Sequence, residues 1–204
     1  MQKHDIQSAL QPNLVALEAV WSYQPSLSDT SWSGSYHAIQ SGKQSYVRPE
    51  RDEGSFELTL RKDNPLGLTR QSIGIYVIND REQCLYVGKT DTKIEQRFHA
   101  HVTKLTATNN KRHHHPKKWQ DYARKRWEAD RSSLNRVDGF KLGFYDLSDF
   151  LKFLDQGTKQ AMVNEMEALV YFGLKDLNGN SPLLNTEGQV GHRVAREKWQ
   201  HVFA

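Results

Sequence analysis

The sequence is poor in cysteine and has no long apolar run. Cys84 is the one cysteine among 204 residues, so no disulfide can form within the chain, and a reducing compartment is the default for such a protein. A membrane-spanning helix needs about 20 consecutive apolar residues, which no segment approaches. The first residues lack the apolar core and the small-residue cleavage site of a secretory signal. We therefore expect a soluble, cytoplasmic protein with no membrane partner.

Regular pattern is also scarce in the first third of the chain. Residues 22–54 are rich in serine, glycine and glutamine, which favours loops. We predict only a short helix over Asn13–Trp21 and a strand within 55–63 there. From residue 73 the pattern becomes regular, and a chain of this length fits one domain with extensions. The expected organisation is an N-terminal extension of unclear structure, a core domain and a basic C-terminal tail, over residues 1–70, 71–187 and 188–204.

Two short apolar runs, each with a tyrosine, lie in the segment GIYVINDREQCLYVGKT of residues 74–90. They predict two strands, Ile73–Ile78 and Cys84–Val87, that form an antiparallel hairpin. Pairing Tyr76 with Tyr86 leaves a loop of about five residues. Because side chains alternate along a strand, this pairing places both phenols on one face of the hairpin.

The segment after the hairpin is typical of an amphipathic helix. Thr92 and Glu95 have the spacing of a capping box. Arg97 and His101 are four residues apart and are therefore neighbours on one side of the helix. Spacing alone does not say whether this pair meets the phenols. Apolar residues expected to face the core follow at helical intervals: Ile94, Phe98, Val102 and Leu105.

Positive charge is concentrated in residues 111–131. This segment has eight lysines and arginines against three aspartates and glutamates, a net charge of +5 that exceeds the +4 of the whole chain. Clustered positive charge is the mark of a surface that follows nucleic-acid phosphates, although a solvated helix face has the same composition. Three aromatic residues are expected to pack inward: Trp119, Tyr122 and Trp127. The side chains expected to bind nucleic acid are Lys111, Arg112, Lys117, Lys118, Arg124, Lys125 and Arg126.

A third strand within 137–147 and a long helix over Thr158–Lys175 are predicted further along. Thr158 is a candidate N-cap of that helix. Glu165 and Glu167 both flank its apolar stripe, so periodicity does not separate them.

Together these residues resemble the GIY-YIG nucleases. The matching features, in family order, are GIY at 74–76, YVG at 86–88, Lys89, Arg97, His101, the glutamate of MEALVYF and the asparagine of SPLLN. The resemblance covers about residues 73–187. It implies an α/β (α+β) fold in which a small three-stranded antiparallel sheet is flanked by helices. Two gaps, between Tyr86 and Arg97 and between Glu167 and Asn185, are longer than is common in the family.

The resemblance also implies a role for each residue. Tyr76 would be the general base; a phenol has an ordinary pKa near ~10 and needs nearby positive charge or hydrogen bonds to act at neutral pH. Lys89, Arg97 and His101 are the available cations or donors. Tyr86 would position the water or bind the phosphate, and Arg97 would hold the scissile phosphate. His101 would accept the proton of the phenol or donate to a phosphate oxygen.

A single Mg²⁺, for which Mn²⁺ can substitute, is the cofactor that the resemblance implies, and Glu167 would bind it. The family pattern favours Glu167 over Glu165 because of the apolar residues around it: Met166, Val170 and Tyr171. Asn185 would contact a phosphate or brace the site.

The leading hypothesis is a free-standing, restriction-type endonuclease that hydrolyses duplex DNA. With one site per chain, a double-strand break requires a homodimer or two successive nicks. Two alternatives are a catalytically silent nucleic-acid-binding module of the same fold and a nuclease acting on RNA or branched DNA. The presence of Tyr76, Tyr86, Arg97 and Glu167 argues against the silent module.

Overall fold

The computed structural model describes residues 9–25, 36–41, 44–49, 56–91, 94–106, 117–129, 137–177, 180–186 and 190–203. The chain forms two compact units that are discontinuous in sequence. The first unit comprises Met1–Val20, Lys62–Ile94 and Gly139–Ala204, and the second comprises Trp21–Arg61 and Glu95–Asp138. The domain boundaries expected after residues 70 and 187 stay a prediction. Within the described residues, no helix is long and apolar enough to cross a membrane.

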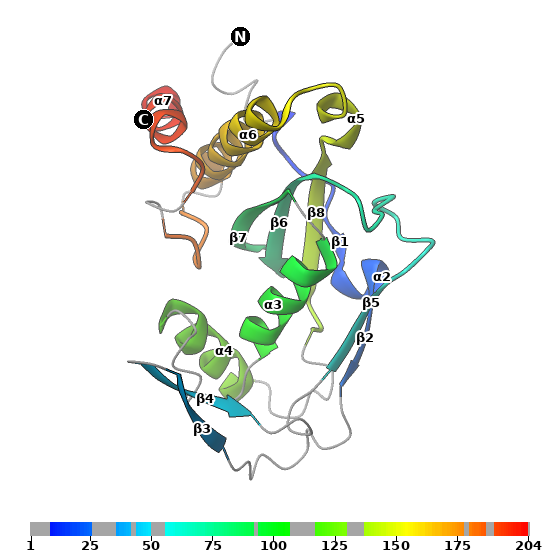
Figure 1. Ribbon diagram of the computed structural model, residues 1–204, viewed down its shortest axis with the longest axis vertical. Coiled ribbons are helices and arrows are strands. Elements are labelled where there is room, and N and C mark those ends of the chain that lie inside the picture. Colours follow the sequence, from blue (N-terminus) through cyan, green and yellow to red (C-terminus); the bar gives the residue numbers. More distant parts are fainter. Residues whose placement is uncertain are drawn as a thin grey trace. The chain divides into compact units, whose positions relative to one another are not determined.

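The first unit is built on an antiparallel sheet with the strand order β1-β8-β6-β7 (Figure 1). Its three long strands are β6 (Gly74–Asp80), β7 (Gln83–Thr90) and β8 (Phe140–Asp146). The mixed α/β class and the three-stranded antiparallel sheet are thus confirmed. The two-residue strand β1 (Val15–Ala16) adds to the outer edge of β8.

The hairpin register differs from the expected one. Tyr76 pairs with Gly88, not with Tyr86, and Ile78 pairs with Tyr86. A loop of about five residues was expected between the strands. Instead, Asn79 and Asp80 remain paired with β7, after a bulge that follows Ile78. Polar residues can pair in this way because the hydrogen bonds between strands join backbone groups. Arg81, with φ of +53°, then completes a tight turn.

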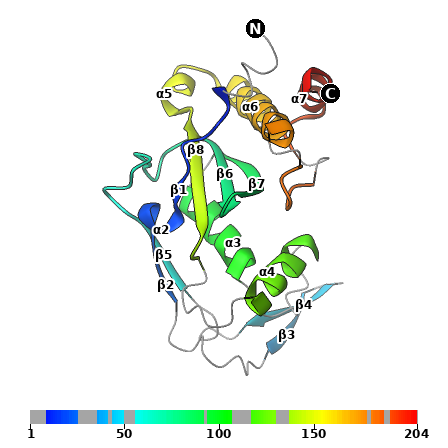
Figure 2. The same ribbon diagram turned by 180° about the vertical axis from the view of Figure 1, so that it is seen from behind.

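Two helices cover one face of this sheet. They are α6 (Gln156–Leu177) and α7 (Arg193–Phe203), which also pack against each other (Figures 1 and 2). The core between these helices and the sheet includes Ile75, Val77, Val87, Val170 and Phe203. Burial raises the pKa of the Cys84 thiol to about 12, so this side chain is an inert core residue at neutral pH.

Short elements complete the first unit. The expected helix over Asn13–Trp21 is wrong, because that stretch divides into β1, the four-residue helix α2 (Leu17–Val20) and the start of a strand. Strand β8 leads into α5 (Ser148–Leu151), a single helical turn. Helix α6 begins at Gln156, so Asp155 takes the N-cap position expected for Thr158. The Asp155 carboxylate accepts the Thr158 backbone N–H at 3.0 Å.

The second unit has more strands than the sequence suggests. Strand β2 (Trp21–Pro25) pairs with β5 (Phe56–Leu60), which confirms the strand expected within 55–63. The stretch expected to be loop-rich also contains β3 (Tyr36–Ser41) paired with β4 (Gln44–Pro49).

Two helices belong to the second unit, apart from the first residue of α3. They are α3 (Ile94–Thr106) and α4 (Lys117–Ala129). The four apolar residues of α3 expected to face a core are all buried. Thr92 lies outside the described residues. Trp21 stacks on Phe98 with ring centroids 5.2 Å apart, which ties β2 to α3.

Candidate functional site

The two hairpin phenols lie together. The ring centroids of Tyr76 and Tyr86 are 6.1 Å apart and the ring planes differ by 38°. The register makes them diagonal neighbours across β6 and β7, so the expectation that they share one face is confirmed. Gly88 makes room for both, because a Cβ atom there would lie 2.6 Å from Tyr76 Oη and 2.6 Å from Tyr86 Cε1. Tyr76 is 1% exposed and Tyr86 is half-buried.

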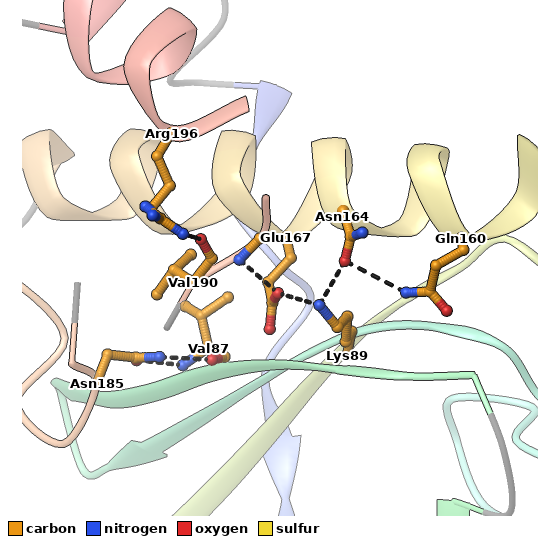
Figure 3. A network of polar contacts seen from close by, with 9 residues as sticks. Val87, Lys89, Gln160, Asn164, Glu167, Asn185, Val190 and Arg196 are labelled. Atoms are coloured by element: carbon orange, nitrogen blue, oxygen red, sulfur yellow. Dashed lines mark hydrogen bonds and ion pairs between the residues drawn. The ribbon is translucent and has the colours of Figure 1, made fainter. Parts of the chain in front are cut away.

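An ion pair joins β7 to α6. Lys89 Nζ lies 2.9 Å from Oε2 of Glu167 and 2.5 Å from Oδ1 of Asn164 (Figure 3). Gln160 Nε2 donates to the same Asn164 oxygen at 3.3 Å. The Glu167 oxygen also accepts the backbone N–H of Gly191 at 2.7 Å. A buried carboxylate needs such partners, because burying an uncompensated charge is costly.

The two glutamates of α6 have different surroundings. Glu167 turns toward the sheet, and its side chain is 7% exposed in the pair with Lys89. Glu165 turns toward α7, where it pairs with Lys198 and keeps 34% of its side-chain surface exposed. Glu167 is therefore the carboxylate next to the hairpin, while Glu165 makes a surface contact.

The phenols and the ion pair occupy neighbouring positions of β7. Gly88 touches both phenols, and Lys89 follows it directly. Since consecutive Cα atoms are about 3.8 Å apart, the two groups meet at adjacent points of the strand, but alternation directs them to opposite faces. Strand β7 is at the edge of the sheet.

Asn185 stabilises this edge. Its side-chain Oδ1 accepts the Val87 N–H at 2.8 Å, and its Nδ2 donates to the Val87 carbonyl at 2.8 Å. The Leu184 N–H donates to the carbonyl of Leu85 at 2.8 Å. Asn185 thus takes the place of a neighbouring strand at this edge, and both of the roles expected for it in the site stay predictions.

Arg97 and His101 lie on α3, in the second unit. Arg97 is exposed. His101 is buried and stacks on Trp119, with centroids 5.3 Å apart. Burial, followed by the positive charges of Lys104 and Arg97, lowers the pKa of His101 to about 3. The ring is therefore neutral at physiological pH, and the roles expected for His101 as a hydrogen-bond donor or proton acceptor stay predictions.

The basic surface of α4 is described in part. Lys117, Lys118 and Lys125 are exposed, as expected. Arg126 is half-buried and donates a hydrogen bond to the carbonyl of Asp138. Trp119 is buried, as predicted, and Tyr122 is half-buried. The remaining candidates, Lys111 and Arg112 and the side chains of Arg124 and Trp127, lie outside the described residues.

Glu167 is the carboxylate that could bind a metal ion beside the hairpin. Among the described residues no group of three or more His, Cys, Asp or Glu side chains is placed to hold a metal. Within the same residues Glu167 accepts its hydrogen bonds at Oε2, and none reaches Oε1. One free carboxylate oxygen fits Mg²⁺, which keeps most of its waters and completes its shell with phosphate oxygens.

Comparison with known protein families identifies the catalytic domain. Residues 72–143 match the GIY-YIG catalytic domain. The protein therefore contains a GIY-YIG nuclease domain. The matched residues of this GIY-YIG domain include both phenols, Lys89, Arg97 and His101, whereas Glu167 and Asn185 lie beyond them. No curated protein and no solved structure matches the chain.

Sequence reasoning missed part of the polar network around Glu167. Asn164 precedes Glu167 by three residues, and that spacing places both on one side of α6. This signal was available in the sequence. Gly191 had no such signal, because its contact with Glu167 depends on how the chain returns to α6.

Proposed function

We propose that the protein is a metal-dependent endonuclease that hydrolyses phosphodiester bonds of duplex DNA. A GIY-YIG domain implies nuclease-type phosphodiester hydrolysis and a nucleic-acid substrate. The observation that carries the finer proposal is the arrangement on β7, where Gly88 contacts Tyr76 and Tyr86 and the next residue holds Glu167. These are the groups that activate a water molecule and bind a metal ion beside a phosphate.

In the proposed reaction Tyr76 acts as the phenolate: its Oη takes a proton from water, the water oxygen forms a bond to phosphorus, and the phenol proton passes to solvent after the reaction. The bond to the leaving sugar oxygen breaks, and that oxygen takes a proton from solvent, which leaves a phosphomonoester and a hydroxyl. Tyr86 positions the water or binds the phosphate. Arg97 supplies a planar pair of donors to the phosphate oxygens. His101, which is neutral, accepts the phenol proton or donates to the phosphate.

Glu167 would hold the Mg²⁺ ion, which would supply charge stabilisation at the phosphate and at the leaving oxygen. Lys89 keeps the Glu167 carboxylate turned toward the sheet. The exposed lysines of α4 would bind the DNA backbone outside the reacting phosphate.

Substrate panels test this proposal. Supercoiled plasmid, linear duplex, forked DNA, single-stranded DNA and RNA are each incubated with the protein in Mg²⁺ or EDTA. The proposal expects cleavage of plasmid and duplex in Mg²⁺, none in EDTA, and none by the Tyr76→Phe variant. Preference for forked DNA or RNA would reassign the substrate. Binding of DNA without cleavage under any metal condition would support the silent module instead.

The restriction-type assignment and the homodimer are further parts of the proposal. A restriction-type enzyme cuts both strands at one sequence, and with one site per chain it needs two copies or two successive nicks. Mapping the ends of the products, together with sedimentation of the protein on DNA, distinguishes a paired cut by a dimer from independent nicks by a monomer.

A further inference from the structure

The Glu167 carboxylate is fixed through one of its two oxygens. The Lys89 ammonium, 2.9 Å away, and the Gly191 N–H, 2.7 Å away, both donate to Oε2 (Figure 3). Two donors from different directions hold the plane of a carboxylate, and charge-assisted hydrogen bonds are among the stronger ones. Oε1 is thereby left in a fixed place as the ligand oxygen. The Gly191 donor is a backbone group that cannot change rotamer.

Position 191 requires glycine. Its φ of +56° is a conformation that side chains rarely adopt. A Cβ atom there would lie 2.6 Å from the backbone carbonyl oxygen of Asn164 and 3.1 Å from Cβ of Ala168. The chain at this point thus lies directly against the α6 turn that carries Glu167, and this close approach is what brings the N–H within reach of the carboxylate.

Helix α7 holds this approach in place. Val190 is buried, and its carbonyl accepts a hydrogen bond from Arg196 Nη1 at 3.1 Å. Ala195 and Phe203 are buried in the same part of the unit, where α7 packs on α6. The N–H of Gly191 is therefore held against the carboxylate by the packing of its own segment, as outer groups commonly orient a metal ligand.

We propose that Gly191 is a positioning residue of the nuclease site, and that the Val190–Gly191 turn, held by Arg196 of α7, serves this site rather than a separate basic tail. This inference rests on the proposed role of Glu167 as the metal ligand. The matched domain covers residues 72–143. The proposal adds a segment that lies beyond this domain and that orients the Glu167 carboxylate.

The first test replaces Gly191 by alanine and uses Gly67→Ala as a matched control. Gly67 has a similar φ of +63°, but a Cβ atom there meets nothing within 4 Å. Binding of Mn²⁺ alone to the full chain is measured by the electron paramagnetic resonance of the free ion. We expect Gly191→Ala to bind Mn²⁺ about 10-fold more weakly and Gly67→Ala to match the wild type. Both should bind DNA in EDTA as the wild type does. Unchanged Mn²⁺ binding by folded Gly191→Ala would overturn the inference.

A second pair of variants covers the case in which Gly191→Ala does not fold. Arg196→Met removes the hydrogen bond to the Val190 carbonyl, while Arg193→Met removes an exposed arginine that pairs with Glu197 on the same helix. The Mn²⁺ affinity should fall for Arg196→Met and not for Arg193→Met. Equal affinities of the two variants would contradict the positioning role.

Glu167→Gln tests the role of Glu167 as metal ligand separately from the positioning role of Gly191. If this variant keeps the Mn²⁺ affinity of the wild type, Glu167 is not the metal ligand and the proposed function is wrong on this point. If Glu167→Gln loses Mn²⁺ while Gly191→Ala and Arg196→Met keep it, Glu167 stands as the ligand and only the role of Gly191 is wrong.

Discussion

At the scale of single residues, Gly88 is where the two parts of the candidate site meet on one strand. It contacts both phenols, and the residue after it holds Glu167. A Cβ atom at this position would come within 2.6 Å of the Tyr76 hydroxyl, so the rings have to move. We predict that Gly88→Ala lowers kcat about 10- to 100-fold, because small misplacements of reacting groups are costly.

Gly143→Ala is the control for this prediction. Gly143 lies in β8, and its Cβ atom would come equally close, 2.6 Å, to the side chain of Pro12 rather than to a phenol. Both variants should lose about 1–3 kcal/mol of unfolding free energy through overpacking. If plasmid cleavage falls equally in both, the loss reflects stability, and the role assigned to the phenols is not supported.

His101 gives a prediction about stability and pH. Its pKa is lowered in the folded protein from 6.5 to about 3 by burial and by the charges of Lys104 and Arg97. The unfolded chain therefore binds a proton below 6.5 that the folded chain does not bind. The stability due to neutral His101 is present above 6.5 and is lost as the pH falls toward the folded pKa.

We expect the wild type to lose about 2 kcal/mol more unfolding free energy than His101→Gln between about pH 8 and about pH 5. Urea unfolding of both proteins at the two pH values measures this difference, because the other titrating groups cancel in the comparison. Parallel pH dependence of the two proteins would mean that His101 has the same pKa in the folded and the unfolded state, which would contradict the prediction.

At the scale of elements, α4 is the test of nucleic-acid binding. Lys117 and Lys125 are exposed on this helix. Removing one lysine that binds a phosphate should reduce the slope of log K against log salt by about 0.9. We predict that Lys117→Ala and Lys125→Ala both weaken DNA binding and reduce this slope. Lys152→Ala, which removes an exposed lysine paired with Asp149 after α5, should leave the slope unchanged. Equal slopes for all three variants would exclude α4 as a phosphate-binding surface.

Elements with strong periodicity could be predicted from the sequence, and elements that depend on pairing could not. The apolar spacing of α3 predicts its buried face correctly. The hairpin register was missed because Asn79 and Asp80 continue strand β6 after a bulge. The hydrogen bonds between paired strands join backbone groups, so the polarity of the side chains does not predict them. Strands β3 and β4 were missed for a related reason, since polar residues in a two-stranded ribbon lack the alternation of a half-buried strand.

At the scale of the whole molecule, the residues that the sequence nominates for catalysis are far apart in the chain and divide between the two units. Tyr76, Tyr86, Lys89 and Glu167 belong to the first unit, and Arg97 and His101 belong to the second. Their order along the chain pointed to the nuclease family. Periodicity did not separate Glu165 from Glu167, and the family pattern favoured Glu167. Packing distinguishes the two glutamates, because Glu167 meets Lys89 and Glu165 meets Lys198.

The most direct measurement compares Glu167→Gln with Glu165→Gln in cleavage of supercoiled plasmid in Mg²⁺, with DNA binding measured in EDTA. Each variant removes one negative charge from the same helix. We predict that Glu167→Gln loses roughly 1000-fold or more in rate, which corresponds to about 4 kcal/mol, while it still binds DNA. Glu165→Gln should cleave as the wild type does. A Glu167→Gln variant that cleaves normally, or a Glu165→Gln variant that is the inactive one, would contradict the account.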